Sequence, residues 1–425
     1  MYRDVLVIGA GVLGLSSAYH LKRKNPEKSV LVVDALGGPG RGNTAKSAGV
    51  FYNLHSSESN YLLADSTIDW LFHLQDDLGY DLDLAQHGYL YLLSESKYSM
   101  LRGLVSKMRR WGIDLRTYDK DELKRVMPDL VTEFGEEETE LMGLDPVDVG
   151  LFGVKCGSVN TDALARSLEV DFLGLGGEVS YNTAVTSLIL RPERRLDLPG
   201  EPFVWQDIQV VGAETERGEI EAETTVVAAG VWSERLLDPI GFDPLMRPKT
   251  RAIFVFKDPR LQGLLGVRGF SSLNTLPFTQ IPEIRIYLKA ELTEGSIWLG
   301  CADDFGRRYG LEDDPKPESG LYSNSIYPAL VKYLPCFQDI RPVNMWAGQR
   351  AINRYDGVPV VAPAPGMIYV GSATGTGIMK CDALGRAVAA LYADEEDVEL
   401  FGGRRLKAAS LGVETRGVEK EAFKI

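Results

Sequence analysis

Residues 4–34 contain the pattern that most restricts what this chain can fold into. A strand-like apolar run leads into a turn with Gly9, Gly11 and Gly14, a helix-like segment follows, and a second apolar run ends at Asp34. In such a unit the first glycine permits the tight turn, the second lets the backbone approach a pyrophosphate, and the third lets helix and strand pack closely. The N–H groups at the helix start bind phosphate, and Asp34 can accept ribose hydroxyls. The segment therefore predicts a βαβ unit that binds a dinucleotide.

Composition narrows the remaining possibilities. The chain has 425 residues, 44% apolar residues and a formal net charge of −14, which suits two domains with ordinary cores. The acidic balance disfavours nucleic acid and anionic membranes as partners. No apolar run approaches the ~20 residues of a membrane span. The four cysteines are far apart and form no CxxC pair, so we expect no metal site. Because we also expect no signal peptide, we expect these thiols to be reduced in a cytoplasmic protein.

The rest of the chain divides by texture. A loop of small residues covers 37–49, and apolar residues at helical spacing predict a helix over 59–78. The middle third contains β-branched and aromatic runs separated by turn residues, which indicate an antiparallel sheet. Near the end, a short strand, a glycine-rich turn and a helix over 378–392 follow one another, and the tail after 402 is expected to be a surface helix or an extended arm.

Three separated blocks resemble the D-amino-acid oxidase superfamily of FAD enzymes, which includes glycine oxidase, sarcosine oxidase and dye-linked proline dehydrogenases. The first block is the N-terminal unit with the loop 43–49, and the second is 225–233, similar to the family's VVAAGAWS strand and turn. The third joins 346–350 to 356–359, 369–371 and the Gly375-Thr376-Gly377 turn. The blocks occur in the family's order across nearly the whole chain.

The resemblance implies an α/β fold: a Rossmann-like FAD-binding domain with an inserted α+β substrate domain built on an antiparallel β-sheet. The FAD domain would comprise 1–85, 146–245 and 335–400, the substrate domain 86–145 and 246–334, and 401–425 would form a C-terminal tail. The residues that the resemblance assigns to FAD are Gly9, Gly11, Val12, Leu13, Gly14, Asp34, Ala35, Asn43, Thr44, Ala45, Lys46, Ser47, Ala48, Gly49, Val185, Ala229, Gly230, Trp232, Gly348, Arg350, Gly375, Thr376, Gly377, Ile378 and Met379.

Arg350 is the leading substrate residue. In glycine-oxidase-like members an arginine at the equivalent point of the WAGxR motif binds the substrate carboxylate, a task that suits a guanidinium fork; the alternative is a structural salt bridge with Asp356. Tyr287 could lie over the substrate as family tyrosines do, although any inward-facing tyrosine would look the same. His55 is the histidine expected near the flavin ring, either as a catalytic group or as an ordinary buried histidine.

The turn at 375–377 could support the flavin. The helix expected to start there would direct N–H groups and a positive dipole end at the N1 and C2 carbonyl region, where negative charge builds on reduction. A routine helix cap is the alternative.

Two departures from sarcosine oxidases are informative. Gln349 stands where those enzymes attach FAD through a cysteine, so we expect non-covalent FAD. Met379 stands where they hold the carboxylate with a lysine, and Lys380 would lie roughly 100° further round a helix.

Three functions are weighed. The first is oxidation of the Cα–N bond of an amino acid, proline or another small or secondary one, by hydride transfer to flavin N5, with a dye or quinone-like acceptor. The second is a 2-hydroxy-acid or glycerol-3-phosphate dehydrogenase on the same fold. The third is an FAD-holding electron-transfer or assembly subunit. A homo-oligomer is left open.

Overall fold

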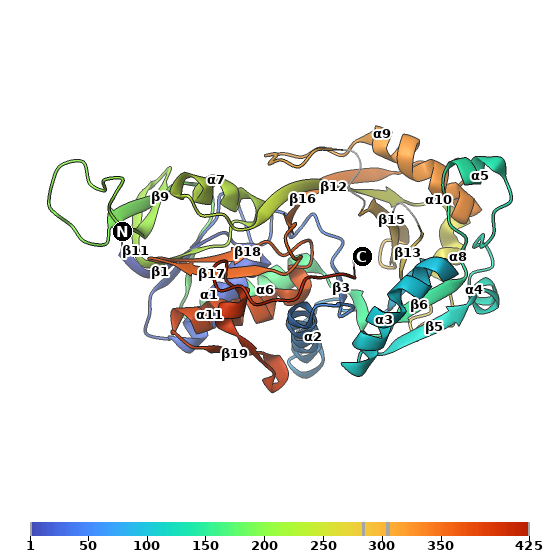
Figure 1. The fold of residues 1–425 in the computed structure, drawn as a ribbon, viewed down its shortest axis with the longest axis horizontal. Helices are drawn as coiled ribbons and strands as arrows, with labels where there is room; N and C mark the ends of the chain where they lie inside the picture. The colour runs from blue at the N-terminus through green and yellow to red at the C-terminus, as the bar shows by residue number, and fades with distance from the viewer. Residues whose placement is uncertain (1, 283–284, 303–306, 424–425) are drawn as a thin grey trace.

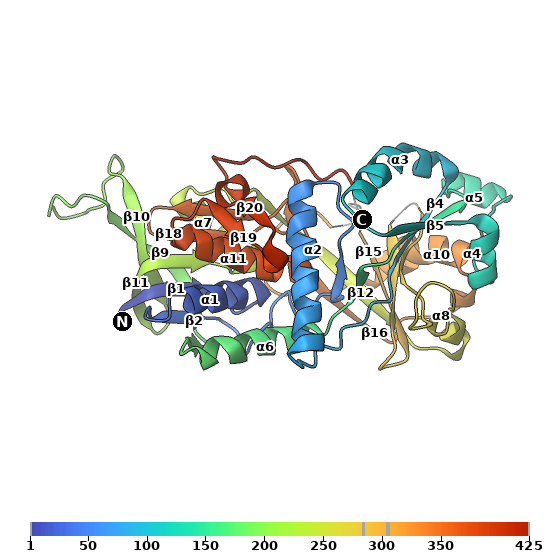
Figure 2. The ribbon, with the colours of Figure 1, turned by 90° about the horizontal axis from the view of Figure 1, so that it is seen from below.

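The computed structural model describes residues 2–282, 285–302 and 307–423. Within these ranges the strands form two eight-stranded sheets and two two-stranded sheets. The two large sheets lie in separate lobes, with α2 standing between them in the second view (Figures 1 and 2).

The first sheet contains the predicted dinucleotide unit. Its core order is β17-β18-β11-β1-β2-β8, in which β18, β11, β1, β2 and β8 run parallel, and β10 and β9 continue antiparallel from β11. The strands are β1 (Tyr2–Ile8), β2 (Val30–Val33), β8 (Glu178–Ser180), β9 (Val185–Pro192), β10 (Ile208–Thr215), β11 (Gly218–Val227), β17 (Val360–Ala364) and β18 (Met367–Gly371).

The centre of β1 is apolar throughout because both of its faces are covered. Val5 and Val7 belong to one core cluster, whereas Leu6 and Ile8 belong to another, as the alternation of side chains along a strand requires. The first cluster packs beneath the helices α1 (Val12–Lys24), α2 (Glu58–Phe72), α6 (Thr161–Gly174) and α11 (Cys381–Tyr392).

The second sheet is largely antiparallel, in the order β16-β12-β15-β14-β13-β4-β6-β5. One face buries a core of Phe254, Leu288 and Leu299 against Leu264 of α8 (Gln262–Leu265) and Leu330 of α10 (Tyr327–Tyr333). The strands are β4 (Tyr89–Leu93), β5 (Leu115–Asp119), β6 (Val149–Gly153), β12 (Met246–Phe256), β13 (Phe278–Gln280), β14 (Ile286–Glu291), β15 (Ser296–Cys301) and β16 (Asn344–Asn353).

Two strands lie in a different sheet from the one expected. Residues 149–153 and 344–353 fall in segments assigned to the FAD domain, yet β6 pairs with β4 and β5, and β16 pairs with β12 along ten residues. The expected boundaries at 145/146 and 334/335 therefore do not coincide with the change of sheet, because pairing between distant segments leaves no local pattern. The domain division otherwise stays a prediction.

The remaining elements connect or flank the sheets. They are α3 (Glu95–Arg110), α4 (Lys120–Val126), α5 (Glu137–Leu141), α7 (Ser233–Leu237), α9 (Ser319–Leu321), β3 (Val50–Tyr52), β7 (Cys156–Ser158), β19 (Asp397–Glu399) and β20 (Arg405–Lys407). Among the described residues, no helix has the length and apolarity needed to cross a bilayer.

Candidate active site between the two sheets

The turn from β1 to α1 has the geometry that its glycines predict. Gly9 has φ +109°, and a Cβ there would lie 2.6 Å from the Ala228 carbonyl oxygen. A Cβ at Gly14 would lie 1.8 Å from the Gly9 carbonyl oxygen. The N-cap of α1 is Gly11, which has no capping side chain. The Val12 N–H donates a long hydrogen bond to Thr44 Oγ1 (3.4 Å), which leaves the N–H groups of Leu13 and Gly14 in the first turn available for an anion.

Asp34 closes this turn from the end of β2. Its carboxylate accepts hydrogen bonds from the backbone N–H of Ala10 (2.6 Å) and of Leu36 (2.8 Å). Burial raises the pKa of Asp34, and these two hydrogen bonds oppose the rise. Ala35 is exposed beside it, and the Thr183 N–H donates to the Asp34 carbonyl. That bond brings the start of β9, at Val185, to the same edge of the sheet.

The small-residue loop connects the first turn to the second sheet. Gly40 N–H donates to the Ala10 carbonyl, and a Cβ at Gly11 would lie 3.4 Å from Thr44 Oγ1. Asn43 Oδ1 then accepts from the Gln349 N–H (2.8 Å). The loop ends at Gly49, whose φ is +63° and whose N–H donates to Ser47 Oγ. The predicted segment Asn43, Thr44, Ala45, Lys46, Ser47, Ala48 and Gly49 is thus one continuous bridge between the sheets.

Contacts on β16 hold the bridge from the other side. Trp346 donates through Nε1 to the Lys46 carbonyl (3.0 Å), and a Cβ at Gly348 would lie 3.0 Å from Lys46 Cβ. The turn after β11 adds Trp232, whose ring would lie 3.5 Å from a Cβ at Gly42. Trp232 lies shortly after Ala229 and Gly230 in the chain, and Gly230 has φ +59°. The three blocks that carry the family resemblance therefore meet at one place.

The last glycine-rich turn docks on β16 in a strained conformation. Ser372, Thr374 and Gly375 all have positive φ (55°, 53° and 80°), which costs energy for the two residues that have side chains. Thr374 N–H donates to the Ala351 carbonyl (2.8 Å). Gly377 lies near the other turn, because a Cβ there would be 3.9 Å from Leu13 Cδ1. The two backbone turns thus stand side by side.

The helix after this turn begins later than the sequence predicts. Ile378–Lys380 form a 3-10 turn, and α11 starts at Cys381. Any ligand at 375–378 therefore meets turn N–H groups rather than an α-helix N-terminus. The Met379 side chain is buried in the first core, whereas Ile378 is partly buried against it.

Arg350 extends from β16 to the Gly375 turn. A Cβ on Gly375 would lie 2.9 Å from Arg350 Cδ and Nε. The alternative salt bridge with Asp356 is not formed, since Asp356 accepts hydrogen bonds from the Arg416 guanidinium (2.5 and 2.7 Å). Arg350 is therefore a half-buried cation beside the turn, as expected of a residue that binds an anion.

An aromatic cluster lies near Arg350; it consists of Tyr52 of β3 and of Tyr89, Phe278 and Tyr287 of the second sheet. The ring centroids lie 5.5 Å apart for Tyr52 and Tyr89, 4.8 Å for Tyr89 and Phe278, and 5.1 Å for Phe278 and Tyr287. Burial raises the pKa of each of the three tyrosines, and the charge of Arg350 opposes each rise. Tyr287 thus lies near Arg350 in a buried aromatic environment. Its position over the donor stays a prediction.

A polar cluster contacts the turn through Lys380 and Thr376; it consists of His55, Asn60, Lys380 and Glu421. Lys380 Nζ donates to Asn60 Oδ1 (2.6 Å) and Thr376 Oγ1 (2.8 Å). Asn60 Nδ2 donates to Glu421 (3.0 Å), which also lies 3.2 Å from His55 Nδ1. Burial lowers the pKa of Lys380 to about 7 and that of His55 to about 4. His55 Nε2 is buried and has no hydrogen-bond partner.

The sequence pattern missed several of these residues. Tyr89, Lys380 and Glu421 were not singled out for the site. Tyr89 and Tyr91 alternate in a predicted strand, which does put two tyrosines on one face, and Tyr91 accepts a hydrogen bond from Gln280 while Tyr89 donates one to it. Nothing local indicates Glu421, which reaches the site only because the tail folds back.

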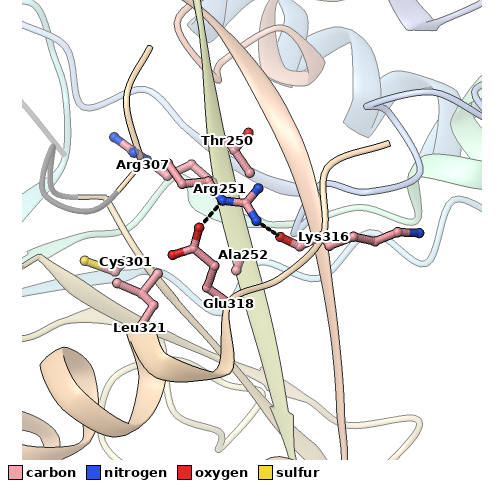
Figure 3. Close-up of a pocket in the computed structure, with 8 residues that line it drawn as sticks. All are labelled: Thr250, Arg251, Ala252, Cys301, Arg307, Lys316, Glu318 and Leu321. Atoms are coloured by element: carbon pink, nitrogen blue, oxygen red, sulfur yellow. Dashed lines mark hydrogen bonds and ion pairs between the residues drawn. The ribbon is translucent and has the colours of Figure 1, made fainter. Parts of the chain in front are cut away.

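Two further pockets border the site. The smaller, about 30 Å³, is lined in part by Arg307, which pairs with Glu318 and donates to the Lys316 carbonyl (Figure 3). The larger, about 660 Å³, is lined in part by Lys46, Trp298 and Trp346. It lies beside the small-residue bridge, where Trp346 of β16 donates to the Lys46 carbonyl.

The residues present fit FAD. Neighbouring backbone leaves no room for side chains at Gly9 and Gly14 in the first turn, so a pyrophosphate can approach there. Asp34 lies at the edge of this turn. The bridge at 43–49 connects this turn to β16, on which the Gly375 turn docks. At the tether position, Gln349 Nε2 donates to Thr250 Oγ1 and the Gly310 carbonyl, and its Oε1 accepts from the Glu312 N–H. This side chain is thus fully engaged within the protein.

Comparison with known proteins agrees with this geometry. A family model described as "DAO: FAD dependent oxidoreductase" matches residues 4–391. The chain is 25% identical over 419 residues to "FAD-dependent oxidoreductase domain-containing protein 1" of Bos taurus, covering 91% of this chain and 80% of that one. It is 22% identical over 309 residues to the mitochondrial L-2-hydroxyglutarate dehydrogenase of Homo sapiens, covering 70% and 60%. The structure of L-proline dehydrogenase from P. horikoshii superimposes with a TM-score of 0.73 at 17% identity, covering 92% and 94%, and so shares the fold.

Proposed function

Because the chain belongs to the DAO family of FAD-dependent oxidoreductases, we propose that it oxidises the Cα–N bond of an amino acid, proline or another small or secondary one. FAD, when bound, supplies the hydride acceptor at N5. Electrons then pass to a dye or quinone-like acceptor, for which the pocket beside Lys46 and Trp346 offers access. A cytoplasmic location and a homo-oligomeric state stay predictions from the sequence.

The observation that carries the proposal is Arg350 beside the Gly375 turn, facing buried tyrosines. A guanidinium fork binds a carboxylate with two parallel charge-assisted hydrogen bonds. Such binding fixes the donor's Cα relative to the turn, which is what positions a C–H for hydride transfer. Tyr287, whose phenol lies close enough to Arg350 for its charge to act on it, would cover the donor.

The surroundings favour a neutral amine. The aromatic cluster provides no carboxylate for an ammonium group, and the nearby Glu421 is already bonded to Ser56, Asn60 and His55. Burying a second cation beside Arg350 is unfavourable, so the donor's amine loses a proton on binding. A neutral amine needs no protein base when the α-hydrogen leaves as hydride.

The backbone of the last turn provides for the charge that builds on reduction. The N–H groups of Gly375, Gly377 and Ile378 lie in this turn, and Lys380 is bonded to Thr376 within it. FAD is held without a covalent bond, since Gln349 cannot form a thioether and is bonded to Thr250, Gly310 and Glu312.

A 2-hydroxy acid is the second candidate donor, and one specific observation favours it. His55 Nε2 is buried without a partner, and the low pKa of this imidazole keeps it neutral above about pH 4. A neutral imidazole can accept the hydroxyl proton that such a donor must lose and an amine need not. The resemblance to L-2-hydroxyglutarate dehydrogenase points the same way.

The test is anaerobic reduction of the flavin, read by bleaching of its visible absorbance. The donors are L- and D-amino acids, proline, sarcosine, glycine, lactate, 2-hydroxyglutarate and glycerol 3-phosphate. We expect bleaching by an amino acid without any partner protein. Bleaching by none of them would favour an electron-transfer or assembly subunit and contradict the proposal.

Two pairs of variants assign the roles. Arg350→Met should retain FAD and raise the donor's apparent Kd about 100-fold, the loss of two charge-assisted hydrogen bonds, whereas Arg354→Met, an exposed arginine four residues along, should not. His55→Asn should abolish reduction by a 2-hydroxy acid but spare an amino acid. His73→Asn is its control, because that histidine pairs with Asp77 outside the site.

A further inference from the structure

The C-terminal tail returns to the space between the two lobes. Both views show the chain end there, beside α2 and the second sheet (Figures 1 and 2). The sequence predicted a surface helix or extended arm, yet Phe423, the last described residue, is 3% exposed. Residues 424 and 425 of the predicted tail lie outside the described residues.

Arg416 fixes the start of this return. Its guanidinium binds both carboxylate oxygens of Asp356 and donates to the carbonyls of Val358, Leu411 and Gly412. The Arg416 side chain is 7% exposed and that of Asp356 is 5% exposed. A buried bidentate pair with this many additional hydrogen bonds has one geometry, so the chain leaves it in a defined direction.

Glu421 fixes the next point. Its carboxylate accepts from the Ser56 N–H (2.8 Å), from Ser56 Oγ (2.6 Å) and from Asn60, while its own N–H donates to the Asp356 carbonyl (2.7 Å). Burial acts to raise the pKa of Glu421. The hydrogen bond and charge interaction with His55 and the hydrogen bonds from Ser56 outweigh burial and hold this pKa below its ordinary value. The carboxylate therefore stays ionised in the native protein at neutral pH.

Phe423 is held by the same residues. Its N–H donates to Ser56 Oγ and to Glu421 Oε1, both at 3.0 Å. Its ring lies 5.6 Å from that of Tyr91, and it belongs to the same core cluster as Tyr89, Phe278 and Tyr287. Through Tyr91, Phe423 therefore extends the aromatic cluster that lies near Arg350.

We propose that Phe423 is the residue that limits the size of the donor's side chain, and that Glu421 is the positioning residue that holds it there. The inference rests on the proposed function, since it concerns the same donor site. A donor bound through its carboxylate to Arg350 directs its side chain towards the aromatic cluster. A ring fixed at the outer end of that cluster excludes long or bicyclic side chains and accepts short or five-membered ones.

The test uses binding of inert carboxylates to the FAD-loaded protein, read by perturbation of the flavin absorbance, so no turnover is needed. The probes are acetate, pyrrole-2-carboxylate, benzoate and 1-naphthoate. In the wild type, affinity should fall steeply from pyrrole-2-carboxylate to 1-naphthoate. Phe423→Ala should tighten 1-naphthoate binding about tenfold or more, the scale on which a pocket discriminates one or more ring carbons, with acetate changed less than about twofold.

A second substitution works in the opposite direction. Phe423→Trp should weaken the binding of benzoate and leave the binding of acetate unchanged. This variant keeps the test decisive if Phe423→Ala fails to fold. Glu421→Gln should change the order of affinity among the four carboxylates in the same direction as Phe423→Ala. Glu419→Gln is the matched control, since that residue lies on the same tail and pairs with Lys107 at the exposed surface.

The outcomes separate this inference from the proposed function. If carboxylates bind and Arg350→Met weakens them, but both Phe423 variants keep the wild-type size ranking, the inference is overturned and the proposed function stands. If no carboxylate binds the wild type, or if Arg350→Met binds them equally well, both are overturned.

Discussion

Arg350 and Gly375 are in direct contact: a single Cβ on Gly375 would come within 2.9 Å of Arg350 Cδ and Nε. The glycine is also at φ +80°, where L side chains are strained. The side chain of Arg350 therefore has its place because residue 375 has no side chain. The two residues are 25 positions apart in the chain.

Gly375→Ala should accordingly impair donor binding. We expect the alanine to displace the guanidinium, to raise the Kd of inert carboxylates at least about tenfold, and to destabilise the protein by about 1–3 kcal/mol through backbone strain. Flavin absorbance titration and urea unfolding measure the two effects. Unchanged carboxylate affinity would mean that Arg350 does not bind the anion from its observed position.

Lys380 should make stability depend on alkaline pH. Its pKa is lowered to about 7 in the folded protein, against an ordinary value of 10.5. Between these values the unfolded chain binds more protons than the native one, so stability rises with pH, by at most about 1.4 kcal/mol per pH unit. Urea unfolding of the FAD-saturated protein from pH 7 to 10 should show this rise, and Lys380→Met should remove it.

The matched control for that series is Lys332→Met. Lys332 binds Glu136 and Glu138, and these hydrogen bonds raise its pKa, so it stays protonated in both states across the same window. The control should keep the wild-type slope. An unchanged slope in Lys380→Met would show that the buried amine titrates normally.

His55 should make stability depend on acidic pH. Burial lowers its pKa to about 4 from 6.5, so the unfolded state binds more protons between these values and stability is lost as pH falls through them. The corresponding upper limit is about 3 kcal/mol. His55→Asn should flatten the profile between pH 6.5 and 4 in the same unfolding measurement. The stabilisation from Glu421 is fully present above its ordinary pKa of 4.5, so the loss of stability that its protonation causes should appear in the variant only below about pH 4.5.

The first turn should tolerate no side chain. Gly14→Ala would put a Cβ 1.8 Å from the Gly9 carbonyl oxygen, and we expect loss of bound FAD or of the folded protein. Gly103→Ala is the control: it lies in α3 with nothing within 4 Å of the added atom. It should retain FAD and gain about 0.5–1 kcal/mol. Stoichiometric FAD in Gly14→Ala would contradict the cofactor site.

The sequence was most informative where structure is set by neighbouring residues. The glycines of the first turn, Asp34 and the Gly375 turn all function through short-range backbone geometry, and each was recognised. Arg350 was chosen because it matches the arginine of the family's WAGxR motif, and not from a predicted strand. The family resemblance suggested that Tyr287 could lie over the substrate, but its proximity to Arg350, 63 positions away, was not predicted.

Other features depend on contacts between distant segments. Arg350 lies in the second sheet because β16 pairs with β12. No local sequence pattern indicates this pairing. Lys380 was expected to lie roughly 100° round a helix from Met379, and no local pattern indicated that its amine is buried and donates to Asn60 and Thr376. Glu421 and Phe423 reach the site through the Arg416 contact with Asp356, which joins positions 60 residues apart.

A crystal structure of the FAD-loaded protein with pyrrole-2-carboxylate tests the central claim most directly. The account predicts both carboxylate oxygens within about 3.2 Å of the Arg350 guanidinium, with the flavin ring along the Gly375-Thr376-Gly377 turn and the pyrrole ring against Tyr287. A carboxylate bound away from Arg350, or a flavin ring remote from this turn, would contradict it.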